Sequence, residues 1–203
     1  MEKVVPVTLE NAPEVSEMLA SAFFTHPWHR VLKWTMEDCL SFCNTVVNFC
    51  APKGLSYATY CDGKPVAAII LDDGWSQMPF EESLLPKAMP IISVFNKLRG
   101  SEAGFLKDKK WAHVFLLGAD PHLRANGYAR KCSVAAYQGL YEKGYSHYTT
   151  EVAAPESKHL AEALQGTVVV SADPREVHVD FGSCDLMGHL IIGRVEKYAE
   201  IRF

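Results

Sequence analysis

A strand, a tight turn and a helix follow one another in residues 111–145, and this order constrains the fold more than any other part of the chain. The run Val114–Leu117 is apolar and of strand length. Pro121 ends it, because proline cannot donate to a strand ladder. Gly127 lies in the following turn, and apolar residues at helical spacing begin at Ala129. Since the N–H groups of such a turn and of the helix N-terminus point at one spot, the stretch predicts an anion site suited to a pyrophosphate.

Two other interpretations of this stretch stay open. A dinucleotide-binding Rossmann unit fits less well, because it needs three spaced glycines and a later acidic residue for the ribose, and only Gly127 is present. An ordinary strand–turn–helix connection in some other α/β fold is the second alternative, because a short motif is only a hypothesis.

Residues 124–129, Arg-Ala-Asn-Gly-Tyr-Ala, resemble the Arg/Gln-x-x-Gly-x-Gly/Ala motif of the GNAT superfamily of acyl-CoA-dependent N-acyltransferases. The preceding strand, ending Leu-Gly-Ala-Asp-Pro, and the following helix, ending near Gly144, fit the same pattern. The resemblance implies one N-acetyltransferase domain over residues 1–203, of mixed α/β (α+β) class. Its central sheet would have six to seven mostly antiparallel strands flanked by helices, and the fourth and fifth strands would splay apart.

The rest of the sequence predicts elements that suit this class. Strands are expected at 4–8, 55–61, 65–71, 147–153, 167–171 and 177–181, and helices at 13–24, 35–50 and 155–165. Asp62-Gly63 predicts a hairpin between the second and third strands. The tail 186–203 is compatible with a hairpin or a helix.

Residues 75–110 are too long for an ordinary connection and predict a helical insertion. The insertion either covers a substrate or packs on the core as a surface excursion. This layout, with a helical insertion before a tryptophan-containing fourth strand, is similar to that of the small-molecule acetyltransferases that resemble puromycin acetyltransferase.

Composition narrows the partners. The formal net charge is −4 and no basic run occurs, so nucleic acid and membrane surfaces are not expected partners. Without a signal peptide or an apolar stretch of membrane-spanning length, we expect a soluble, cytoplasmic protein. Six cysteines are expected to be reduced. Cys39, Cys43 and Cys50 share a helical face, but a metal site would need tighter pairs, so buried thiols are expected and a metal is not.

The resemblance implies acetyl-CoA as co-substrate. The pantetheine would follow the fourth strand, and the pyrophosphate would accept hydrogen bonds from the turn, where Gly127 lets the backbone approach closely. The residues that the motif assigns to this role are Leu117, Gly118, Ala119, Arg124, Ala125, Asn126, Gly127, Tyr128, Ala129 and Arg130.

The proton acceptor is expected on the fourth or fifth strand. Similar enzymes often place a glutamate eleven residues before the arginine of the motif, and that position is His113 here. An unperturbed imidazole titrates near ~6.5, which suits a base at neutral pH. Glu151 is the second candidate. The alternatives are a core histidine bonded to a carbonyl group and a carboxylate paired at a strand edge.

The last helix departs from the family pattern. Where the family has an asparagine and a thiol-protonating tyrosine, this chain has Pro155 and Glu162. His159 or Tyr128 could protonate the leaving thiolate instead, although a solvated helix face explains His159 equally well.

These features predict an N-acetyltransferase that transfers an acetyl group from acetyl-CoA to a small-molecule amine by direct attack in a ternary complex. The missing tyrosine and asparagine favour a first alternative, a catalytically weak CoA-binding sensor or subunit. A protein or peptide N-acetyltransferase is the second. Two sets of residues could receive the amine. The first is Trp28 and Trp34, which could instead be core residues. The second is the acids Asp38, Asp72 and Asp73, which could instead be solvated loop residues. A homodimer stays open.

Overall fold

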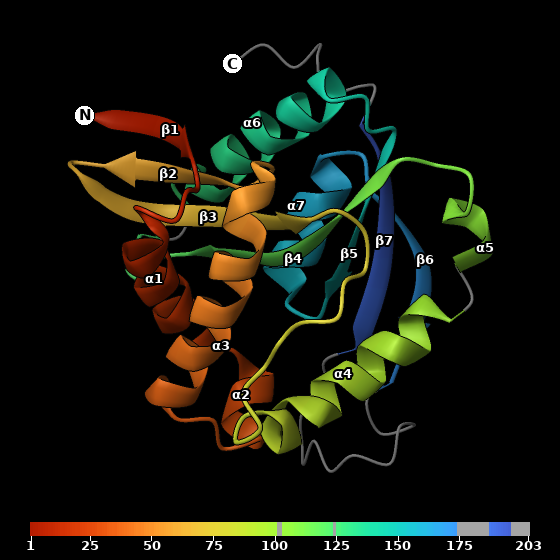
Figure 1. Ribbon diagram of the computed structural model, residues 1–203, viewed down its shortest axis with the longest axis horizontal. Coiled ribbons are helices and arrows are strands. Elements are labelled where there is room, and N and C mark those ends of the chain that lie inside the picture. The colour runs from red at the N-terminus through yellow and green to blue at the C-terminus, as the bar shows by residue number, and fades with distance from the viewer. Residues whose placement is uncertain (101–102, 124, 174–186, 196–203) are drawn as a thin grey trace.

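The computed structural model describes residues 1–100, 103–123, 125–173 and 187–195. Seven strands within these ranges form one sheet in the order β1-β2-β3-β4-β5-β7-β6, in which only the β4–β5 pair is parallel (Figure 1). The predicted fold class is therefore confirmed. The strands are β1 (Glu2–Pro6), β2 (Tyr57–Cys61), β3 (Lys64–Asp72), β4 (Trp111–Ala119), β5 (His147–Val152), β6 (Thr167–Ala172) and β7 (Gly188–Arg194).

Helices cover both faces of the sheet. α1 and α3 pack on one face, where Leu19 and Val46 meet Ile70, and α6 packs on the other, where Leu140 meets Ile69. Alternate residues of β3 thus reach opposite cores, as a central strand requires. The helices are α1 (Ala12–Phe24), α2 (Pro27–Val31), α3 (Met36–Cys50), α4 (Leu85–Arg99), α5 (Ala103–Leu106), α6 (Tyr128–Glu142) and α7 (Pro155–Ala163), and Ala51–Lys53 form a 3-10 turn.

α3 carries the clustered cysteines. Cys39, Cys43 and Cys50 are free and fully buried on its inner face. Burial raises the pKa of the Cys50 thiol to about 12, so it stays protonated at neutral pH. The interpretation of these three residues as buried thiols is confirmed, and the expectation that the cysteines are reduced stays a prediction.

The predicted opening between β4 and β5 is present. The two strands pair only from Trp111↔His147 to Val114↔Thr150, while β4 continues along β3 as far as Ala119. At the last rung, the Thr150 hydroxyl donates to the Val114 carbonyl at 3.3 Å. A bulge in β4 near Phe115 bends the strand at the same place. One edge of β4 is thereby left facing an opening in the sheet.

The segment between β3 and β4 contains α4 and α5. α4 lies on the same face as α1 and α3, over β6 and β7 (Figure 1). Its residues Val94 and Leu98 bury against Leu190 of β7 and Trp28 of α2. The insertion therefore packs on the core, and its position also brings it to the opening in the sheet.

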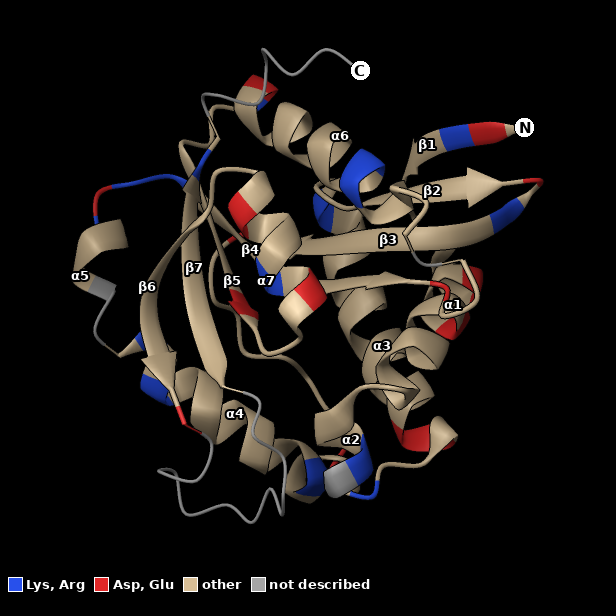
Figure 2. Ribbon diagram, turned by 180° about the vertical axis from the view of Figure 1, so that it is seen from behind, with Lys and Arg blue, Asp and Glu red and all other residues tan. Residues whose placement is uncertain are grey.

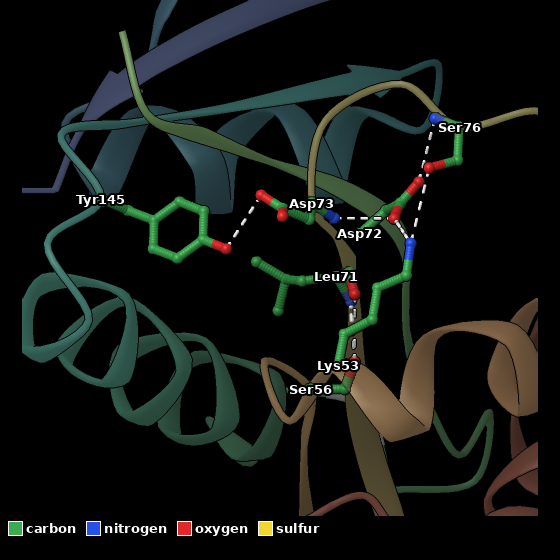
Figure 3. A network of polar contacts seen from close by, with 7 residues as sticks. All are labelled: Lys53, Ser56, Leu71, Asp72, Asp73, Ser76 and Tyr145. Atoms are coloured by element: carbon green, nitrogen blue, oxygen red, sulfur yellow. Dashed lines mark hydrogen bonds and ion pairs between the residues drawn. The ribbon is translucent and has the colours of Figure 1, made fainter.

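Asp72, at the end of β3, holds the start of the segment between β3 and β4 in place through its hydrogen bonds. Asp72 is neither an amine-attracting surface acid nor a solvated loop acid, the two interpretations that the sequence left open, because its side chain is fully buried at the end of β3. It forms an ion pair with Lys53 and accepts the N–H groups of Asp73 and Ser76, at 2.7 and 3.0 Å (Figure 3). Burial raises its pKa, but Lys53 and Ser76 outweigh that effect, so the net shift is downward. Asp73 accepts a hydrogen bond from the Tyr145 hydroxyl at 2.9 Å.

The tail of the chain supplies a strand. β7 pairs antiparallel with both β5 and β6, which decides between the hairpin and helix alternatives for residues 188–194. The strand expected at 177–181 lies outside the described residues.

Candidate functional site

A cavity of about 890 Å³ passes through the opening between β4 and β5. Its volume is in the range of small-molecule sites. Its walls come from the end of β4, the turn before α6, the end of β5, α7, and aromatic residues of α1–α4. The residues that define these walls include Leu117, Gly118, Ala119, Ala125, Asn126, Gly127, Tyr128, Ala129, Arg130, Glu151, Ser157, His159, Phe23, Trp28, Phe42, Phe95 and Phe115.

The turn at residues 125–130 has the conformation of an anion cradle. Ala125 and Gly127 both have left-handed backbones, with φ of +66° and +74°. Within the described residues, no backbone N–H of this turn donates to another protein group, and no side chain caps α6. The Thr59 hydroxyl anchors the turn to β2 by donating to the Tyr128 carbonyl at 2.9 Å. Unpaired amides at a helix N-terminus fit the pyrophosphate of acetyl-CoA.

Positive charge accompanies these amides. Figure 2 shows Lys and Arg at the start of α6, where Arg130 and Lys131 lie in the sequence. Lys131 pairs with Glu2 at 2.5 Å on the exposed surface. Arg124, the first residue of the motif, lies outside the described residues.

A buried charged group also lines the cavity. Glu151 of β5 lines the cavity with a side chain that is 2% exposed. Its Oε1 accepts from Nε of Arg99 at 2.5 Å, and its Oε2 lies 2.6 Å from Nε2 of His113. Because an ionised carboxylate only accepts, Nε2 of His113 must carry the hydrogen. The site is thus one acid held by two donors.

Arg99 and His113 keep Glu151 ionised. Burial raises the pKa of its carboxyl, but His113 and Arg99 outweigh burial and lower the pKa to about 2. Glu151 is therefore a carboxylate throughout the neutral range. His113 lies behind it, with a buried Nδ1 that has no hydrogen-bond partner within the described part of the chain.

Comparisons with known proteins give structural matches only. No protein-family model matches the sequence, and no curated protein matches it. The solved structures that it resembles include a polyamine N-acetyltransferase of Drosophila melanogaster, with 13% identity and a TM-score of 0.74, covering 96% of this chain and 100% of that one. Arylalkylamine N-acetyltransferase 2 of Aedes aegypti has 11% identity and a TM-score of 0.75, with coverage of 96% and 99%. The C-terminal condensation domain of Ebony, solved with β-alanyl-dopamine, has 16% identity and a TM-score of 0.75, with coverage of 96% and 99%. The chain has the GNAT fold.

In this GNAT fold, the candidate catalytic residues predicted from the sequence lie in or next to the cavity. His113 and Glu151 are brought together, with Glu151 on the cavity wall and His113 behind it. His159 lines the cavity from an exposed position on α7, next to Ser157. Sequence reasoning missed Arg99, which comes from the last turn of α4 and lies 52 residues from its partner.

The side of the cavity formed by α1–α4 is aromatic. Trp28 and Trp34 are buried, as core tryptophans are, and Trp28 also lines the cavity. Burial, together with His26, lowers the pKa of His29 to about 4, so His29 is neutral and donates from Nδ1 to the Phe23 carbonyl at 2.8 Å. Asp38, offered above for the amine, instead closes the capping box of α3 and pairs with Lys87.

Metal ions and membranes are the remaining classes of partner. Within the described ranges, no three His, Cys, Asp or Glu side chains are grouped so that they could hold a metal ion. The same ranges contain no helix with the length and apolar character needed to span a bilayer.

Proposed function

We propose that this protein is an acyl-CoA-dependent N-acetyltransferase, which transfers an acetyl group from acetyl-CoA to a small-molecule amine by direct attack in a ternary complex. The observation that carries the proposal is the continuous cavity between the unpaired amides of residues 125–130 and the buried carboxylate of Glu151. A cytoplasmic location, the absence of a metal requirement and a homodimer belong to the same proposal.

Each part of the cavity has its own role in this reaction. Amides of 125–130, with Arg124, hold the pyrophosphate, and the free edge of β4 at Leu117–Ala119 holds the pantetheine. Glu151 accepts a hydrogen bond from the amine and so directs the nitrogen lone pair at the thioester carbon. A C–N bond forms and the C–S bond breaks. The nitrogen loses its proton to a free lone pair of the Glu151 carboxylate, while His113 keeps its Nε2 hydrogen bond to that carboxylate, and His159 donates a proton to the thiolate.

The charges around the cavity favour an aromatic monoamine as acceptor. Within the described residues, the lining carboxylates are Glu151, which is paired with Arg99, and Glu156, which is exposed at the start of α7. A second ammonium group on the acceptor would lie among Phe42, Phe95 and Phe115 without a counter-ion, and burying an unpaired charge is costly. An aromatic ring, in contrast, gains contacts there.

The shape of the cavity favours a small acceptor over a protein. Trp28 of α2 and Phe95 of α4 contact each other, with ring centroids 6.2 Å apart. This contact joins the first helices to the insertion beside the cavity, where a peptide would need an open groove.

Steady-state acetylation with 2-phenylethylamine, butylamine, putrescine and spermidine tests the proposal. We expect kcat/KM for 2-phenylethylamine to exceed that for putrescine by at least about tenfold, because a buried unpaired charge costs more than 1.4 kcal/mol. Preference for the diamine would reject the acceptor class alone. Acetyl-CoA binding without turnover of any amine or peptide would favour the sensor alternative, and turnover of peptides only would favour the protein acetyltransferase.

A further inference from the structure

We propose that Arg99, supplied by the insertion helix α4, is a positioning residue that holds the Glu151 carboxylate in the orientation required by the attacking amine. The inference rests on the proposed acetyltransferase function and goes beyond it, because it assigns the insertion a part in the reaction.

Arg99 is itself held in place. Its guanidinium carbon lies 5.3 Å from the Trp75 ring centre and 5.9 Å from that of Phe95, and its side chain is 20% exposed. Trp75 in turn packs edge-on against Trp111 at 4.8 Å. A guanidinium stacked on aromatic rings has few accessible rotamers, so it can fix a partner more firmly than a flexible lysine can.

The carboxylate is fixed through both oxygens. Arg99 donates to Oε1 and His113 donates to Oε2, so rotation of the carboxyl group would break one charge-assisted hydrogen bond or both. A carboxylate has about four lone-pair sites, and two donors leave acceptor capacity for an amine. Arg99 therefore orients Glu151 without displacing the acceptor.

α4 also connects this carboxylate to the acceptor wall. Phe95 and Arg99 lie one turn apart on the helix, and Phe95 lines the cavity. Val94 and Leu98 anchor the same turn on β7 and α2. One rigid helix thus positions both the aromatic wall and the cation that orients Glu151.

Kinetics of Arg99→Gln and Arg99→Lys test this role, with Lys97→Gln as the control that removes a positive charge from an exposed position of the same helix. At neutral pH we expect Arg99→Gln to lower kcat for 2-phenylethylamine on the order of 10²-fold, as small misplacements at reacting centres do. The acetyl-CoA Kd should change by less than about twofold. Arg99→Lys should recover part of kcat, and Lys97→Gln should match the wild type.

The pH profile separates positioning from a packing role. Within the described residues, the charged or titratable groups bonded to Glu151 are Arg99 of α4 and His113 of β4. The others that share its cavity include His26, His29, His159, Glu156 and Arg130. Without Arg99 the Glu151 pKa rises from its value of about 2, so the activity of Arg99→Gln should begin to fall at a higher pH than wild-type activity does when the pH is lowered. Arg99→Lys should show a smaller effect in the same direction.

The outcomes are distinct. No turnover by the wild type rejects the proposed function. An active wild type with unchanged Arg99→Gln kcat, or with a reduced kcat but an unaltered pH profile, overturns the role of Arg99. If Arg99→Gln does not fold, Arg99→Lys decides by the same profile, and an activity and profile equal to those of the wild type would overturn the role.

Discussion

Glu151→Gln is expected to lower kcat/KM for amine acetylation by about 10²- to 10⁴-fold, the range typical of losing a positioned acid–base group. Glutamine keeps the size of the side chain and one acceptor oxygen, but it removes the charge to which Arg99 and His113 donate. Because Glu151 lies on β5, whereas the proposed pyrophosphate site is the turn at residues 125–130, the affinity for acetyl-CoA should be retained. Initial rates of thiol release and isothermal titration with acetyl-CoA measure the two quantities.

Glu162→Gln is the matched control. Glu162 lies on α7 with a side chain that is 46% exposed, so the same chemical change there should leave kcat/KM within about twofold of the wild type. If Glu151→Gln behaved like this control, Glu151 would be a structural ion-pair partner and the proposed mechanism would be wrong.

Gly127→Val is expected to weaken acetyl-CoA binding by about 10- to 100-fold, which corresponds to ~1–3 kcal/mol of backbone strain. Gly127 has φ of +74°, a conformation that β-branched residues avoid, and no atom lies within 4 Å of a Cβ built there. The substitution therefore acts through the turn, whose amides would no longer point at one spot. Isothermal titration with acetyl-CoA measures the loss.

Gly63→Val carries the same strain away from the cavity. Gly63 has φ of +81° in the hairpin between β2 and β3 and also has free space around a built Cβ. Both variants should lose similar thermal stability, but only Gly127→Val should lose affinity. Equal acetyl-CoA affinity in the two variants would show that the turn does not bind the pyrophosphate.

Local patterns predicted the cofactor half of the site. Strand, proline, glycine and helix follow within one short stretch, and the structure has β4, the left-handed Gly127 and α6 in that order. The class of the sheet and the β4–β5 opening followed from the family resemblance that this stretch carries. Such features depend on residues close in the sequence, where spacing alone is informative.

The catalytic part of the site could not be predicted in full, because it depends on contacts between residues far apart in the sequence. Counting along the chain singled out His113, but burial and pairing across the sheet decided that Glu151, not His113, reaches the cavity. Arg99 ends an ordinary-looking helix, and nothing in its sequence indicates that α4 folds back over the sheet. Asp72 looked like a loop acid until its ion pair with Lys53 was seen. Tertiary packing, which a single sequence does not encode in its spacing, set each of these outcomes.

The most direct test of the account is the initial rate of CoA thiol release, with acetyl-CoA and 2-phenylethylamine varied together. Direct transfer in a ternary complex predicts a rate that saturates in both substrates, with intersecting double-reciprocal lines, because both must occupy one cavity before the acetyl group moves. Thiol release that does not depend on the amine, or parallel lines indicating a covalent acetyl-enzyme, would contradict it.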